Sequence, residues 1–111
     1  MATDGTLSSL VYQNELNKKN IEYFIPNEKH QKIIMKLIYE DVKVGNKVNI
    51  DEFDMLVNYF LDNSCDKIII GCTELSIIVD DYNRRNDYIV DSLYVLAKKT
   101  IELADADIKE I

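Results

Sequence analysis

The sequence contains very few residues able to bind a metal or cross-link the chain. His30 is the single histidine, and the cysteines are Cys65 and Cys72. Two cysteines at this spacing do not form a zinc motif, so we expect no metal site. A disulfide between them would have to bend the apolar strand predicted before Cys72 back on itself. Both cysteines are therefore expected to be reduced thiols.

Basic clusters and long apolar runs are also missing. The net charge is −7, and no basic cluster exceeds the pair Arg84-Arg85, which argues against binding to nucleic acid. The longest apolar run, around residues 68–70, is far shorter than the roughly 20 residues needed to span a bilayer. The N-terminus lacks the basic segment and apolar stretch of a signal peptide. These absences predict a cytoplasmic protein without a membrane segment.

What the sequence does contain is the composition of a globular domain. Hydrophobic residues make up 47% and charged residues 30% of the 111 residues. This balance differs from that of disordered chains, which have too little apolar surface to bury. The length is that of one domain, so residues 1–111 are expected to fold as a single unit.

The first half of the sequence shows helical patterns around one strand pattern. Apolar residues at helical spacing predict a helix over residues 6–19, with Thr6 as its N-cap. Residues 21–25, Ile-Glu-Tyr-Phe-Ile, predict a short strand that ends at Pro26. Asn27 is suited to cap a second helix that ends near Gly45, and Asn49 or Asp51 opens a third.

The second half predicts a buried strand followed by a helix. Residues 67–71, Lys-Ile-Ile-Ile-Gly, are apolar and β-branched without alternation, as in parallel strands covered on both faces. A short helix over 73–79, a brief strand over 88–90 and a closing helix from Ser92 follow. The expected fold is α/β, with a small parallel sheet in a three-layer α/β/α arrangement. Ligands of such sheets bind beyond the carboxyl ends of the strands, where Cys72 lies.

Cys72 is the first candidate for chemistry. It follows the buried strand and precedes Thr73 and Glu74 at a predicted helix start. Free N–H groups and the helix dipole at such a position favour thiolate over thiol, which would make Cys72 a base. The alternative is a small buried residue that fills a strand end, since free cysteine is among the most buried residue types.

Four segments, in order, resemble the second domain of the aspartate/glutamate racemase family. Residues 71–74, Gly-Cys-Thr-Glu, resemble its second cysteine motif. Residues 2–6, Ala-Thr-Asp-Gly-Thr, resemble the segment that opens that domain, and residues 38–45 resemble a helix end with a basic residue near the substrate. Asp91-Ser92 match the start of the closing helix. The resemblance covers nearly the whole chain but about half of the family's two-domain length.

The resemblance implies a cofactor-independent amino-acid racemase that acts on aspartate or glutamate. Such enzymes bring one cysteine from each of two similar halves to opposite faces of the substrate α-carbon. Cys72 would be one acid/base, and the substrate-binding residues would come from three segments: Thr3, Thr6, Lys43, Thr73 and Glu74. The simpler interpretations are that Thr6 is only an N-cap and Lys43 a surface charge that compensates a helix dipole.

The sequence also departs from the family. Leu93 and Leu96 stand where the closing helix usually carries threonine and histidine, and Ser76 replaces a common proline. Met1 directly precedes Ala2, so by this resemblance we expect most of the family's first strand and its N-terminal racemase domain to be absent. We therefore expect a truncated racemase with little or no activity alone. The alternatives are a non-catalytic binding or dimerisation module, and a homodimer that opposes two copies of Cys72.

Overall fold

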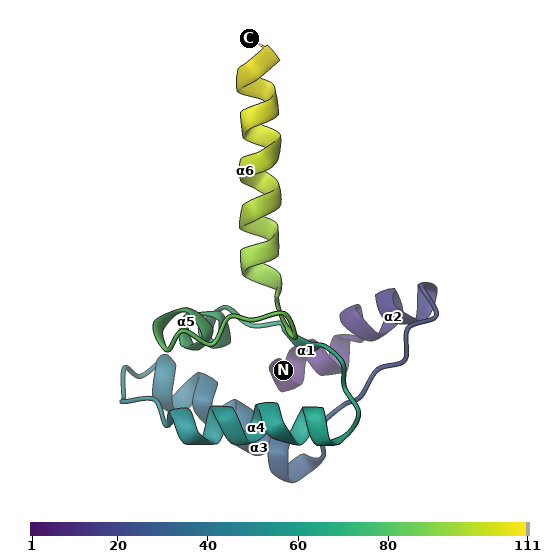
Figure 1. Cartoon of the computed structure of the whole chain (residues 1–111). Helices are drawn as coiled ribbons and strands as arrows, with labels where there is room; N and C mark the ends of the chain where they lie inside the picture. The colour runs from purple at the N-terminus through teal and green to yellow at the C-terminus, as the bar shows by residue number, and fades with distance from the viewer. Residues whose placement is uncertain (111) are drawn as a thin grey trace.

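A computed structural model describes the backbone of residues 1–110 and the side chains of residues 1–103. Within this part of the chain the protein is a mostly helical α/β fold with a two-stranded parallel sheet (Figure 1). The elements are α1 (Asp4–Ser9), α2 (Val11–Lys18), α3 (Glu28–Lys36), the π-helix η1 (Leu37–Val42), α4 (Ile50–Asp62), β1 (Ile68–Ile70), α5 (Thr73–Asp81), β2 (Ile89–Asp91) and α6 (Ser92–Glu110).

The N-terminal helix differs from the prediction in its start and its continuity. Thr3, not Thr6, is the N-cap of α1, since its hydroxyl accepts a hydrogen bond from the backbone N–H of Thr6. Leu10 adopts a left-handed conformation with φ of 60°, which separates α1 from α2. A left-handed residue turns the chain at a point where a continuous helix was expected. The turn directs Gln13 into the interior, where it is 5% exposed.

The strand predicted over residues 21–25 is wrong. This segment forms no ladder and connects α2 to α3 as an irregular stretch. A strand needs a hydrogen-bonding partner, and β1 pairs with β2 on one edge and with the backbone of Met1 on the other. The apolar side chains of residues 21–25 consequently remain well exposed.

The other predicted elements are confirmed with small changes of boundary. Asn27 caps α3, and Asn49 caps α4 by accepting a hydrogen bond from the N–H of Glu52. β1 and β2 are parallel, with Ile68 opposite Ile89. α5 connects the two strands, as in the βαβ units that join parallel strands. The chain thus places the N-terminus of α5 directly beyond the carboxyl end of β1.

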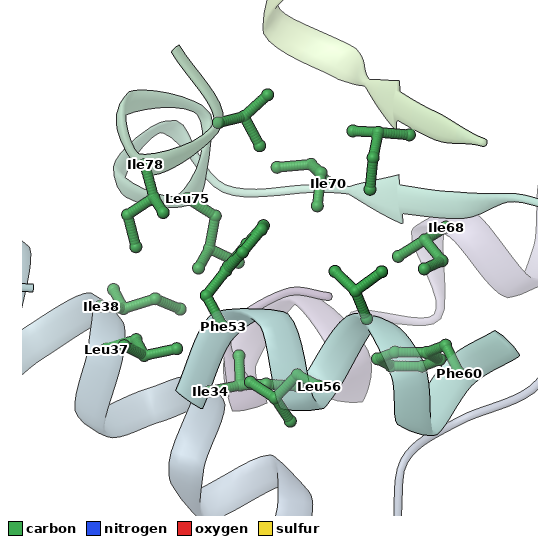
Figure 2. Packing of buried hydrophobic residues seen from close by; sticks show 13 residues of the cluster. Ile34, Leu37, Ile38, Phe53, Leu56, Phe60, Ile68, Ile70, Leu75 and Ile78 are labelled. Atoms are coloured by element: carbon green, nitrogen blue, oxygen red, sulfur yellow. The ribbon is translucent and has the colours of Figure 1, made fainter. Parts of the chain in front are cut away.

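One hydrophobic core joins three helices to one face of the sheet. The side chains that meet there come from α3 with η1, from α4, from both strands and from α5 (Figure 2). Each buried Leu, Ile or Phe contributes about 1.5–3 kcal/mol relative to an exposed one. The labelled members are Ile34, Leu37, Ile38, Phe53, Leu56, Phe60, Ile68, Ile70, Leu75 and Ile78.

The last helix stands apart from this core. α6 leaves β2 and projects away from the rest of the protein, with the C-terminus at its far end (Figure 1). Leu93, Leu96 and Ile101 are 46%, 64% and 62% exposed. The predicted closing helix is therefore present, but these three apolar residues are not part of the core. No helix in the described part of the chain is both long enough and apolar enough to cross a membrane.

Candidate functional site

Cys72 lies between a buried strand and the start of a helix, as the sequence predicted. It is extended, with φ of −146° and ψ of 136°, and it occupies the N-cap position of α5. Its carbonyl accepts hydrogen bonds from both the backbone N–H and the hydroxyl of Ser76. The side chain is partly buried, and both cysteines are free thiols. The strand and the helix together hold the thiol beyond the carboxyl end of β1.

The Cys72 thiol donates a hydrogen bond to Glu74. Sγ lies 3.0 Å from Glu74 Oε2. Burial raises the pKa of the Cys72 thiol, and the bond to the carboxylate raises it further. The backbone N–H groups of Glu74 and Leu75 act in the opposite direction but do not cancel these effects. The expectation that the helix start yields a thiolate is therefore wrong for the free protein, because desolvation and an adjacent carboxylate outweigh the helix N-terminus.

Glu74 is the centre of the polar cluster. Its Oε2 also accepts a hydrogen bond from the hydroxyl of Thr73 at 2.9 Å, and its Oε1 lies 3.6 Å from Lys43 Nζ. The bond from Cys72 is the largest cause that lowers the pKa of Glu74, and Thr73 and Lys43 add to it. Cys72, Thr73, Glu74 and Lys43 thus form one contact group, hereafter the thiol cluster. It contains a neutral proton donor, an ionised carboxylate and an ammonium.

The π-helix η1 positions Lys43 in the thiol cluster. The Lys43 N–H donates to the carbonyl of Ile38, five residues earlier, at 3.1 Å. Such π-turns are rare and often occur at functional sites. The Lys43 ammonium also lies 4.5 Å from the centroid of the Tyr39 ring. A cation over an aromatic face is stabilised by the ring quadrupole, so Tyr39 helps to hold Lys43 beside Glu74.

Thr3 and Thr6 contact each other and not the thiol cluster. Their hydroxyl oxygens are 3.0 Å apart at the start of α1. The backbone nevertheless brings this start to the same edge of the sheet as Cys72, because the Gly71 N–H donates to the Met1 carbonyl at 2.8 Å. This contact places Met1, two residues before Thr3, beside the residue that precedes Cys72. Among the described residues, no hydrogen bond joins either threonine to the thiol cluster.

A buried polar network centred on Asp91 adjoins the thiol cluster and was not predicted from the sequence. Asp91, 3% exposed, accepts a hydrogen bond from Ser76 Oγ at 2.6 Å and one from Arg85 Nη1 at 3.2 Å. The Arg85 guanidinium lies 4.1 Å from the centroid of the Tyr94 ring. Since Ser76 also binds the Cys72 carbonyl, this network fixes the backbone that carries the thiol. The sequence signal for this network was Ser76, a hydroxyl residue at a position where the racemase family commonly has proline.

A well-defined cavity lies away from the thiol cluster. A cavity of about 710 Å³ opens between β1 and residues 21–25, and its lining includes Gly71 but not Cys72. The described residues contain no group of three or more His, Cys, Asp or Glu side chains arranged to hold a metal ion. The thiol cluster is partly open to solvent, with the Lys43 and Glu74 side chains 48% and 19% exposed.

Comparison with known proteins shows a similarity to a bacterial protein over most of the chain. No protein-family profile matches the chain. A protein of Pectobacterium carotovorum subsp. carotovorum, described as "Uncharacterized protein in pnlA 3'region", is 32% identical over 104 residues. The aligned part covers 92% of this chain and 69% of that protein. The description states neither a ligand nor an activity.

Proposed function

We propose that this chain, which belongs to the same family as that Pectobacterium carotovorum protein, supplies one acid/base thiol of a cofactor-independent racemase for aspartate or glutamate. One observation carries the proposal: the Cys72 thiol at a strand end donates to Glu74, which is paired with Lys43. The carboxylate and the ammonium of this group complement the ammonium and one carboxylate of an amino acid, and the thiol adds a proton-transfer group.

The substrate groups have partners of opposite charge in the thiol cluster. The substrate ammonium would bind the Glu74 carboxylate, and one substrate carboxylate would bind Lys43 and the Thr73 hydroxyl. The N–H groups at the start of α5 favour the same anion. An ammonium beside Glu74 would also offset the negative charge that raises the pKa of the Cys72 thiol. Substrate binding would therefore bring the thiol closer to the deprotonated state that a base requires.

The proton transfer needs two groups on opposite faces of the α-carbon. The Cys72 thiolate would accept the α-proton from one face and become a thiol, leaving a carbanion stabilised by the carboxylate. An acid on the other face would donate a proton to invert the centre, and the Cys72 thiol would do the same in the reverse direction. The thiol cluster contains one such group. The isolated chain is therefore expected to exchange the α-proton with retention rather than to racemise.

The test is α-proton exchange of L-aspartate and L-glutamate in deuterated water, followed by NMR and chiral chromatography. Exchange without inversion, abolished in Cys72→Ala but kept in Cys65→Ala, is the expected result. Glu74→Gln should weaken binding of the amino acid, because it removes the carboxylate that would bind the substrate ammonium. Exchange that persists in Cys72→Ala, or its complete absence with substrate shown to bind at the thiol cluster, would overturn the proposal.

A second candidate is a non-catalytic α/β module derived from a racemase, which binds or dimerises. The apolar residues of α6 favour it, because Leu96 and Ile101 are 64% and 62% exposed. Large exposed apolar patches mark interaction sites in soluble proteins. Under this alternative the amino acid neither exchanges nor shifts the NMR signals of Thr73 and Glu74, while sedimentation shows a dimer. The three-layer arrangement resembling the racemase second domain remains part of the first proposal.

A further inference from the structure

The cavity between β1 and residues 21–25 lies along an unfilled edge of the sheet. It is hereafter called the β1 groove. Its volume is about 710 Å³, within the range of about 300–1,000 Å³ in which ligands bind. Its walls are largely apolar and come from α2, residues 21–25, α4 and β1: Leu16, Ile21, Ile25, Phe60 and Ile68.

One wall of the groove is a partly used strand edge. The Ile68 N–H donates to the carbonyl of Tyr88, so Ile68 and Ile70 bond toward β2. Alternation then directs the N–H of Ile69 and the carbonyl of Lys67 to the opposite edge. At that edge the Met1 amino group donates to the carbonyl of Ile69, and the Gly71 N–H donates to the carbonyl of Met1. Met1 thus already pairs with β1 in the manner of a parallel strand.

The same alternation directs the N–H of Ile69 away from β2, toward the edge that Met1 occupies. Outside the β1–β2 ladder, the backbone hydrogen bonds of the described residues include none from this N–H. The Met1 amino group does not add a charge at neutral pH, since burial lowers its pKa to about 5. A row of backbone donors and acceptors beside an apolar groove is a template for another strand.

The opposite wall has the composition of a strand without its partner. Ile21, Tyr23 and Ile25 are 48%, 44% and 43% exposed, although β-branched and aromatic residues favour sheets. Residues 21–25 therefore present apolar side chains along the groove while making no ladder. A strand in the groove would pair with β1 on one side and cover these side chains on the other.

Gln13 adds an unused acceptor inside the groove. It is 5% exposed, and its Nε2 donates to the carbonyl of Leu7 at 3.1 Å. Its Oε1 has no partner among the described residues, and Gln13 belongs to the lining of the groove. A buried acceptor without a partner costs about 1–3 kcal/mol.

We infer that the β1 groove binds an extended apolar segment of a second polypeptide, which adds a strand to the sheet in line with Met1. The occupant is a run of β-branched residues whose backbone pairs with Ile69 and Lys67. The continuity with the Met1 pairing distinguishes this occupant from a compact ligand. The inference is independent of the thiol chemistry, because Cys72 is not part of the groove lining.

The experiment uses the peptide acetyl-Lys-Val-Ile-Val-Ile-Lys-amide and the full chain labelled with ¹⁵N. Binding should slow hydrogen exchange of the Ile69 amide by at least about tenfold and shift the signals of residues 21–25. The same peptide with N-methyl groups on alternate residues keeps its apolar side chains but loses the donors. It should bind at least about tenfold more weakly, equal to about 1.4 kcal/mol.

Two variants test the position without touching the core. Ile25→Asp alters the groove wall, and Leu96→Asp alters α6; both residues are well exposed, at 43% and 64%, so the fold should be kept. Ile25→Asp should abolish peptide binding, and Leu96→Asp should leave it unchanged. Equal binding of the N-methylated peptide, or binding lost only in Leu96→Asp, would overturn the inference. So would concentration-dependent protection of Ile69 without peptide, because a second copy of the chain would then fill the groove.

Discussion

The ring of Tyr12 lies against the backbone of Gly71. A β-carbon at residue 71 would be 3.0 Å from Tyr12 Cε2 and 3.2 Å from its hydroxyl oxygen. That hydroxyl donates to Ser92 Oγ at 3.3 Å, and the Ser92 hydroxyl donates to the carbonyl of Ile70 at 2.7 Å. Gly71, the residue before Cys72, is therefore required by packing: α2 approaches the end of β1 too closely for a side chain.

Gly71→Ala should reduce the free energy of unfolding by about 1–3 kcal/mol, the usual cost of overpacking. The Tyr12 ring is held by Ser92 and cannot move away freely. In a Tyr12→Leu background the same substitution should cost much less, because the obstructing ring is gone. Urea unfolding of the double-mutant cycle measures this coupling. If the unfolding free-energy changes of the two substitutions were strictly additive, residues 12 and 71 would not be in contact.

Glu74→Gln should lower the pKa of the Cys72 thiol. The substitution removes a carboxylate that accepts a hydrogen bond from the thiol and repels the thiolate. The pH profile of iodoacetamide alkylation, measured in a Cys65→Ser background, should shift to lower pH because the thiolate is the nucleophile. Glu15→Gln is the matched control, since Glu15 lies on α2 and pairs with Lys18. An unchanged profile in Glu74→Gln would contradict the hydrogen bond.

Glu74 should stabilise the fold at neutral pH and lose this contribution in acid. Its pKa is lowered from the ordinary value of 4.5, chiefly by the thiol. A carboxyl with a lowered folded pKa contributes fully above its unfolded pKa, and the contribution is lost as pH falls through the folded value. Cys72→Ala should raise the Glu74 pKa in ¹³C NMR titrations, whereas Cys72→Ser, which keeps a donor, should leave it low. A low pKa in Cys72→Ala would assign the shift to Lys43 and Thr73.

Two leucines at helical positions should respond very differently to substitution. Leu75 on α5 is fully buried, so Leu75→Ala should cost about 2–5 kcal/mol of unfolding free energy. Leu96 on α6 is 64% exposed, so Leu96→Gln should change it by less than about 0.5 kcal/mol. Thermal and urea unfolding at low protein concentration measure both. A large cost for Leu96→Gln would mean that α6 packs against the body in solution.

Much of the site was predictable because it depends on local rules. An apolar β-branched run followed by Gly-Cys-Thr-Glu predicts a strand, a turn and a helix start, and Cys72 lies there. The caps at Asn27 and Asn49 follow from the side-chain oxygen that each supplies to a helix N-terminus. The sequence did not predict that the pKa of the Cys72 thiol is raised, because this shift depends on the burial of the thiol and on the rotamer of Glu74, which the tertiary structure sets.

The sequence alone determined where most helices and both strands lie, because capping, spacing and β-branched composition act within a few residues of one another. Only the tertiary structure decided which of these segments found partners. Residues 21–25 have the composition of a strand but form no ladder, and α6 has an apolar face but remains outside the core. The physical reason is common to both: a strand or an amphipathic helix is completed by surfaces that its own residues do not contain.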